Sequence, residues 1–439
     1  MDRIKRWVEE AITAGYEYEV YVEKRRKTTV ESSDETLENL IKSEDAGIGI
    51  RVFKDKKMGF SYTTDLTESS LKDCVRFAMQ ACNVTPEDEG FSVGNCKSWG
   101  TLDTYYDKEG VEKPVEEKIE LVIDLERRAK SLDSRVRGVR KTSLKEIELE
   151  VICFNSCQLY YTYRGTWYTS MIAVLTEEDG DQSISYEFVG SRRLSELPLQ
   201  EMLQEVVFKA TATLKPSSIH TKKMPIILYR DASAMILEAF SPLFLGDYLV
   251  KGKTFLKGME GEPIFSEKLT IVDDGSMKGG FLSLPVDAEG HPTQKNVLVE
   301  KGRFIGFLHS TYTALKSGAN PTGNSVRDSF KSPPSSGITN LYIEPGEYSL
   351  EEMLQKDEVF LITDLMGLHT VDPVSGNFSL GASGIIYRGG KREKSVRGVV
   401  IGGNIKELWG AVVEVGKDLR FYGNTGSPSL YIENITVGG

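Results

Sequence analysis

The spacing of hydrophobic residues predicts a helix followed by strands at the start of the chain. Apolar side chains recur at helical spacing between Ile4 and Ile12, whereas residues 18–32 alternate and are rich in Val, Tyr and Thr, as in a strand. Further strands are predicted at residues 37–42, 47–53 and 58–63. A second amphipathic helix then begins at Thr67, which can cap its N-terminus.

The same order of elements recurs in the next part of the chain. A helix is predicted to begin at Pro114, and another begins at Pro198. Between them, strands are predicted at residues 147–154, 158–164, 167–175 and 183–189. Four strands followed by a helix therefore occur twice, which indicates a degenerate internal repeat. Two such halves can share one antiparallel sheet with helices on one face.

Residues 215–223 (KPSSIHTKK) are polar and contain a proline, as expected of a linker. We place the domain boundary there, with an N-terminal domain at residues 1–215 and a C-terminal domain at residues 222–439. Beyond the boundary, short apolar runs are separated by Gly and Pro, which predicts a barrel-like β domain. The predicted fold class is α+β, with an N-terminal α/β domain of duplicated strand-rich halves and a β-rich C-terminal domain.

One further helix is predicted within residues 231–247 (DASAMILEAFSPLFLGD). Its apolar positions give a wide buried face, and Asp231 is placed to cap its first free N–H groups. Pro242 should end or kink this helix near Ser241, because proline cannot continue the hydrogen-bond ladder.

This helix resembles the motif helix of the TldD/TldE (PmbA) family, once called modulators of DNA gyrase. Catalytic members carry His-Glu-x-x-x-His there, followed by Gly-Asp, and a Cys-Gly-Lys near the C-terminus. On this chain the two histidines fall on Leu237 and Pro242, the glutamate is retained as Glu238, and the cysteine falls on Val415. The resemblance extends to three further stretches, at residues 318–340, 367–384 and 415–439.

The resemblance implies a zinc metalloprotease fold whose three metal ligands are replaced. Leu, Pro and Val side chains have no lone pair to offer zinc, so we expect no metal and no catalytic residue on this chain. Glu238 is then vestigial as a general base, because water without a metal keeps a high pKa; the simpler interpretation is an exposed helical glutamate. Zinc is expected only in a TldD-like catalytic partner.

Three functions remain open from the sequence. The first is a non-catalytic subunit of a TldD/TldE-type metalloprotease that degrades or processes unfolded peptides, paired with a catalytic subunit or with itself as a dimer. The second is a metallopeptidase active by itself with displaced ligands, such as His369 with Asp364 and Asp372. The third is an adaptor protein acting on gyrase or on a toxin system.

The strand predicted within residues 376–384 (GNFSLGASG) suggests a place for a peptide. Its small residues could accept an extended peptide as an added strand through the backbone. The candidates for this peptide cleft are Ser379, Gly381, Ala382, Ser383 and Gly384. The alternative is a tight strand pair whose backbones approach closely.

Composition limits the classes of binding partner and the cellular compartment that we expect for this protein. The chain of 439 residues has 65 acidic and 54 basic residues and a net charge of -11, which argues against direct nucleic-acid binding. No apolar run approaches the roughly 20 residues that span a bilayer. The five cysteines are sparse and odd in number, and residues 1–15 form an amphipathic helix without a signal-peptide core, so we expect a reduced, cytoplasmic protein in which Cys153 and Cys157 serve only packing.

Overall fold

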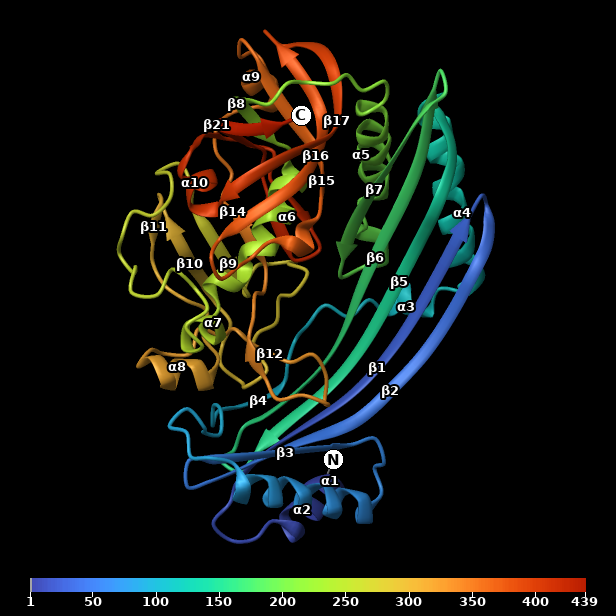
Figure 1. Cartoon of the computed structure of the whole chain (residues 1–439). Coiled ribbons are helices and arrows are strands. Elements are labelled where there is room, and N and C mark those ends of the chain that lie inside the picture. The colour runs from blue at the N-terminus through green and yellow to red at the C-terminus, as the bar shows by residue number, and fades with distance from the viewer. Residues whose placement is uncertain (1) are drawn as a thin grey trace.

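The computed structural model describes residues 2–439, and its N-terminal half is built on one large sheet (Figure 1). The strands are β1 (Glu17–Ser33), β2 (Thr36–Lys54), β3 (Lys57–Thr63), β4 (Ser98–Thr101), β5 (Val136–Asn155), β6 (Tyr160–Glu178) and β7 (Asp181–Ser191). Their order is β3-β2-β1-β5-β6, with β4 and β7 both paired to β6. All pairs are antiparallel except β4 with β6. The long central strands curve around the C-terminal half of the chain.

Two pairs of predicted strands are single long strands. Residues 37–42 and 47–53 both belong to β2, and residues 158–164 and 167–175 both belong to β6. The polar segment Ser43–Gly47 stays in the strand because each of its residues pairs with β1. Hydrophobic periodicity does not report such pairing, since a polar strand still forms its ladder of backbone hydrogen bonds.

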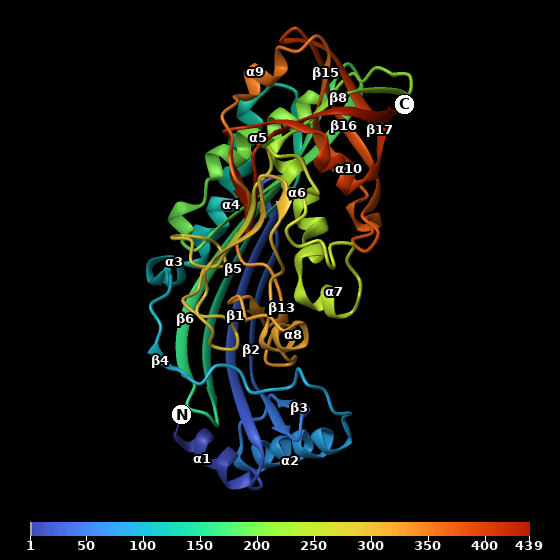
Figure 2. The same ribbon diagram turned by 90° about the vertical axis from the view of Figure 1, so that its left-hand side faces the viewer.

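The internal repeat is confirmed, with three strands in each half instead of four. The first half contains α1 (Asp2–Ala11), β1–β3 and α2 (Glu68–Val84), and the second contains α4 (Val115–Leu132), β5–β7 and α5 (Leu199–Ala212). A short helix, α3 (Lys108–Glu112), lies in the connection between them. The two helix pairs cover opposite ends of the sheet (Figure 2).

All four of these helices lie on one face of the sheet, as predicted. On β1, Val20 packs in a core with residues of α1 and α2, and Val30 packs in a core with residues of α4 and α5. Tyr21 points to the other face, where it packs with Phe330 from the C-terminal half. Because alternate residues of a strand face opposite sides, the second face of the sheet is the one that meets the C-terminal half.

The C-terminal half contains a closed five-stranded barrel, which confirms the barrel-like prediction. The barrel strands are β8 (Lys222–Leu228), β15 (Val359–Met366), β16 (Asn377–Arg388), β17 (Lys391–Asn404) and β21 (Leu430–Gly438), and β18 (Val412–Val415) also pairs with β21. The ring closes because β17 pairs with both β16 and β21. An adjacent sheet contains β9 (Ile271–Asp274), β10 (Lys295–Glu300), β11 (Arg303–Phe304), β14 (Leu341–Ile343), β19 (Arg420–Tyr422) and β20 (Thr425–Ser427).

The remaining elements of this half are short. They are the β12–β13 pair (Ser325–Val326 and Ser335–Ser336) and the helices α6 (Arg230–Phe240), α7 (Gly246–Val250), α8 (Thr311–Ser317), α9 (Leu350–Leu354) and α10 (Ile405–Gly410). Two 3-10 turns of this half occupy Ser241–Phe244 and Leu368–Thr370, and a third, Leu194–Glu196, precedes α5 in the N-terminal half. One large apolar core joins α6 to the barrel and to the adjacent sheet.

Helix α6 ends at Phe240, two residues before Pro242, as the sequence predicts. The cap is different: Tyr229 occupies the N-cap position, and Asp231 lies inside the first turn. The predicted cap position is therefore wrong, but Asp231 Oδ1 still accepts a 2.7 Å hydrogen bond from the N–H of Ala232 in the first turn. Its other carboxylate oxygen, Oδ2, contacts Lys209 of α5, a distant part of the chain.

Cys96 and Cys157 form a disulfide, whereas Cys74, Cys82 and Cys153 are free and buried. The expectation of a fully reduced protein is contradicted, and Cys157 does more than pack. The long connection after α2 folds back onto the β5–β6 turn, where Asn155 donates a hydrogen bond to the carbonyl of Asn95. A separation of 61 residues hides this pairing in the sequence.

Candidate functional site

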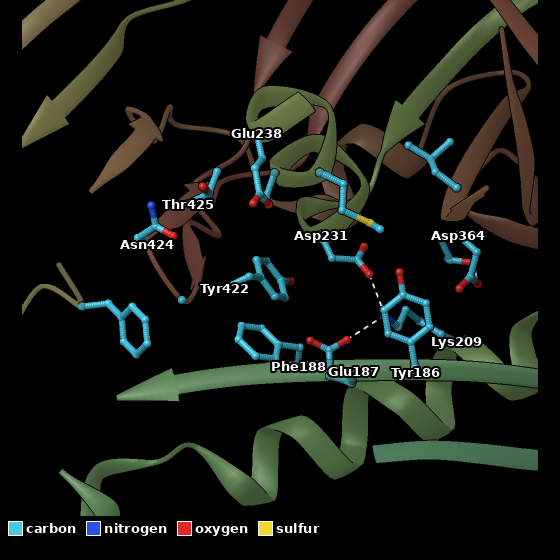
Figure 3. A pocket seen from close by; sticks show the side chains of 16 residues that line it. Tyr186, Glu187, Phe188, Lys209, Asp231, Glu238, Asp364, Tyr422, Asn424 and Thr425 are labelled. Carbon is cyan, nitrogen blue, oxygen red and sulfur yellow. Dashed lines mark hydrogen bonds and ion pairs between the residues drawn. The ribbon is translucent and has the colours of Figure 1, made fainter. Parts of the chain in front are cut away.

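A cavity of about 320 Å³ lies where the large sheet meets the C-terminal half (Figure 3). We call it the interdomain cavity. Its walls come from β7, α5, α6, β15 and the β19–β20 hairpin, with Phe281 from a loop. Segments distant in the sequence therefore build one site, and three of its residues, Asp231, Glu238 and Asp364, were singled out from the sequence for other reasons.

Lys209 holds the two halves together at the base of the cavity. Its ammonium lies 2.7 Å from Glu187 Oε2 on β7 and 2.6 Å from Asp231 Oδ2 on α6. All three residues are buried, with 4%, 2% and 6% of their surfaces exposed. Burial by itself would lower the pKa of Lys209, but the two carboxylates outweigh it and raise that pKa above its ordinary value. Lys209 is therefore a permanent cation in this structure.

The cavity is acidic. Four carboxylates line it (Glu187, Asp231, Glu238 and Asp364), against one lysine. Asp364 has only weak partners, the hydroxyls of Ser185 at 3.4 Å and Thr363 at 3.2 Å, and burial raises its pKa. Glu238 is exposed at the cavity surface, and the surrounding walls remove enough water to raise its pKa as well.

Adjacent residues of α6 face different environments. Glu238 lines the cavity, whereas Leu237 is fully buried in the large apolar core that also contains Val415. Pro242 is half-buried in the 3-10 turn after the helix. Leu237 and Val415 thus share a hydrocarbon environment, which offers zinc no ligand.

A zinc ion of the kind expected in catalytic members of the family does not fit these positions. Their side chains carry no donor atom, and among residues 2–439 no group of three or more His, Cys, Asp or Glu side chains is arranged to hold a metal ion. The structure also does not arrange the displaced ligands suggested from the sequence, His369 with Asp364 and Asp372, as a metal site. His369 is exposed in its 3-10 turn, and Asp372 binds the backbone of Val374 and the hydroxyl of Ser375 within its own loop.

Most of the predicted peptide strand cannot accept a further strand. Ser379, Gly381, Ala382, Ser383 and Gly384 all lie in β16, which pairs with β17 along one side, and the pairing with β15 on the other side begins at Gly381. The backbone from Gly381 to Gly384 is committed to the barrel, so strand addition is excluded there and the prediction is wrong for that part of the strand. The alternative interpretation fits: a Cβ on Gly384 would lie 1.9 Å from the carbonyl oxygen of Leu361, so the backbones approach closely.

Sequence reasoning missed Lys209 and Glu187. Each is a charged residue at a position that faces the interior. Lys209 interrupts the apolar stripe of α5. Glu187 lies on the same face of β7 as Ser185 and Val189, which are also buried. A charged residue on a buried face needs a partner, but the sequence does not show where that partner is.

A mostly antiparallel half-barrel sheet joined to a small closed barrel, with a site between them, defines the class of fold, and comparison with known proteins shows the family. Three family models match successive parts of the chain: PmbA/TldA metallopeptidase domain 1 at residues 18–82, the central domain at residues 108–214 and the C-terminal domain at residues 221–439. The chain belongs to the PmbA/TldD metallopeptidase family.

Relatives match over nearly their whole length. The chain is 25% identical to the metalloprotease PmbA of Escherichia coli O157:H7, covering 98% of this chain and 96% of that protein. It is 26% identical to the metalloprotease TldD homolog of Buchnera aphidicola from Acyrthosiphon pisum, covering 92% and 89%. These names support a family role in peptide proteolysis.

Solved structures share the fold. A protein from Thermotoga maritima named as a modulator of a DNA gyrase superposes with a TM-score of 0.89 at 26% identity, with full coverage of both chains. TldE from Thermococcus kodakarensis superposes with a TM-score of 0.87 at 24% identity, again with full coverage. Within residues 2–439, no helix has the length and apolar composition needed to cross a bilayer.

Proposed function

We propose that this chain is a non-catalytic subunit of a TldD/TldE-type metalloprotease that acts on peptides. The observation that carries the proposal is the chemistry at the three ligand positions. Leu237 and Val415 lie in one apolar core, Pro242 follows the helix, and none of the three can bind zinc. Glu238 remains beside the cavity without a metal-bound water to activate. Zinc and the hydrolytic step then belong to a TldD-like partner.

A free strand edge supports assembly with a partner. The first ten residues of β2, Thr36–Asp45, are exposed, and β3 pairs only with residues from Ile48 onward. Leu37, Leu40 and Ile41 on this segment expose 39%, 41% and 51% of their surfaces. A strand with one free edge and exposed apolar side chains readily pairs with another chain. We therefore assign this edge to the contact with the catalytic subunit or with a second copy of this chain.

Assembly is tested by charging this edge. Combining Leu40→Lys with Ile41→Lys should raise the dissociation constant of the complex at least about tenfold, because both substitutions replace exposed apolar side chains at the edge with charges that pairing would have to desolvate. Sedimentation equilibrium over a concentration series measures it, with the protein alone and with a TldD-like subunit. Leu132→Lys, at a similarly exposed position on α4, is the matched control. If the dissociation constant is unchanged both for the protein alone and for the protein with a TldD-like subunit, this edge is not the interface.

Metal content tests the absence of a catalytic centre. Protein purified without chelators should contain far less than one zinc per chain, and added chelator should not change its melting temperature, because the ligand positions present hydrocarbon. Inductively coupled plasma mass spectrometry and thermal denaturation give the two readouts. A TldD-like protein treated in parallel is the positive control. Stoichiometric zinc with chelator-sensitive peptide hydrolysis by the isolated chain would refute the proposal.

A further inference from the structure

One end of the interdomain cavity contains a buried hydroxyl without a partner. Thr425, at the start of β20, lines the cavity with only 2% of its surface exposed, and its Oγ1 forms no hydrogen bond with any residue that the structure describes. Buried hydroxyl groups are normally hydrogen-bonded, because leaving one unpaired costs free energy. The position of Thr425 therefore points to a ligand that enters the cavity.

Two further acceptors lie toward the same end (Figure 3). Glu238 projects from α6, a helix that is fastened to β20 by a 2.7 Å hydrogen bond between Ser233 and Ser427. The Glu238 carboxylate has no ion pair and no hydrogen bond with another described side chain. Asn424 donates through Nδ2 to the carbonyl of Thr339 at 3.0 Å, which leaves its Oδ1 available. The ligand is thus offered a carboxylate, an amide oxygen and a hydroxyl oxygen.

The charge of the cavity favours a cation at this end. At the base, Lys209 neutralises part of the charge of Glu187 and Asp231, and Arg420 lies 3.8 Å from Glu187. Glu238 and Asp364 have no basic partner within ion-pair distance among the described residues. The excess charge is negative, so it attracts cations and repels anions. A lysine ammonium brings three donors and no acceptor, which matches the three oxygens.

The walls of the cavity indicate which chemical groups the ligand carries beside its cationic group. Met235, Phe188, Phe281 and Tyr422 provide apolar and aromatic surface beside the acceptors. Such walls suit the aliphatic stem of a basic side chain and favour a cation near an aromatic face. The volume of about 320 Å³ is at the lower end for ligand pockets, which suits one residue of a peptide better than a long segment.

We propose that Glu238, Asn424 and Thr425 form a subsite for the cationic group of a basic residue, or of the free N-terminus, of a peptide substrate. The subsite rests on the proposed function, since it assigns this chain the capture of basic peptides for a catalytic partner. Glu238 thereby has a use that needs no metal: it is an ion-pairing group for the substrate.

Calorimetry on the full chain without a partner tests the subsite. The probes are nonapeptides of alanine and glycine, acetylated and amidated, with lysine, arginine or norleucine at the centre. We expect the lysine and arginine peptides to bind at least about tenfold more tightly than the norleucine peptide, as for a charge-assisted hydrogen bond in a partly buried site. A norleucine peptide with a free N-terminus shows whether the α-amino group can substitute for the side chain.

Variants of the cavity residues test whether the preference for basic peptides arises at the proposed subsite. Glu238→Gln keeps the shape of the side chain and should remove most of the preference for lysine without changing the affinity for norleucine, and Thr425→Val should weaken lysine binding several-fold. Glu267→Gln, at an exposed position outside the cavity, is the matched control and should change nothing. Equal binding of all peptides, no binding of any, or an unchanged preference in Glu238→Gln would each overturn the subsite. These measurements need neither assembly nor hydrolysis. A failure of the subsite can therefore be distinguished from a failure of the subunit proposal, because each is tested by a different experiment.

Discussion

Replacing Lys209 with methionine should lower the free energy of unfolding by about 3–5 kcal/mol, the usual cost of removing one partner from a buried ion pair. Methionine keeps much of the apolar stem, so the loss comes mainly from the ammonium. Without it, Glu187 and Asp231 remain buried and face each other uncompensated. Guanidinium chloride denaturation followed by circular dichroism measures the change.

The pH dependence of this variant distinguishes charge from packing. Burial already raises the pKa of Glu187 in the intact protein, and removing Lys209 would raise it further. Protonation at lower pH then removes the unpaired charge, so the stability deficit of the variant should shrink as the pH falls. Lys268→Met, at a half-exposed surface position, should stay within about 0.5 kcal/mol of the unsubstituted protein. A deficit that is small or independent of pH would contradict the role assigned to Lys209.

Replacing Leu237 with alanine should cost about 2–5 kcal/mol of unfolding free energy, the range for a large-to-small change in a packed core. Leu237 is fully buried among the apolar residues that join α6 to the barrel. Its neighbour Glu238 is exposed at the cavity, so Glu238→Ala should change stability by no more than about 0.5 kcal/mol. Denaturant titration of both variants gives the comparison. Similar costs at the two positions would show that the helix is not oriented as described.

Leu237 and Glu238 show that adjacent positions of α6 serve different purposes, one in the apolar core and one at the cavity. A histidine at position 237 would have to leave the apolar core or enter it with an unpaired polar ring, which costs free energy. With leucine, the same position contributes to the packing of α6 against the barrel. The cavity beside Glu238 has an acidic lining, and this lining is the basis of the proposed subsite for basic peptides.

The disulfide and β16 show where pattern reasoning misleads. Five cysteines spread over a long chain suggested a reduced protein, but the fold brings Cys96 to Cys157. The disulfide removes one of the arguments for a cytoplasmic location. In β16, a run of small residues suggested a surface open to peptides, whereas Gly384 is needed because the backbones of β15 and β16 approach closely there.

The sequence by itself determined the family, the α+β class, the duplicated N-terminal half, the barrel-like C-terminal half and the end of α6 before Pro242. These follow from local properties: the period of apolar residues, the turn residues and the motif positions, all of which are written in adjacent residues. The family resemblance also placed the expected ligand positions on Leu237, Pro242 and Val415, whose side chains carry no donor atom for zinc.

Only the tertiary structure decided which residues share a site. Lys209, Glu187 and Asp231 come from a helix, a strand and a second helix of two different halves, and their meeting depends on how the large sheet packs against the barrel. Among the residues that the structure describes, the same packing leaves the Thr425 hydroxyl without a partner and leaves the outer edge of β2 at Thr36–Asp45 unpaired. Long-range contacts of this kind have no signature in local periodicity, because they are fixed by the packing of whole elements and not by the spacing of residues within them.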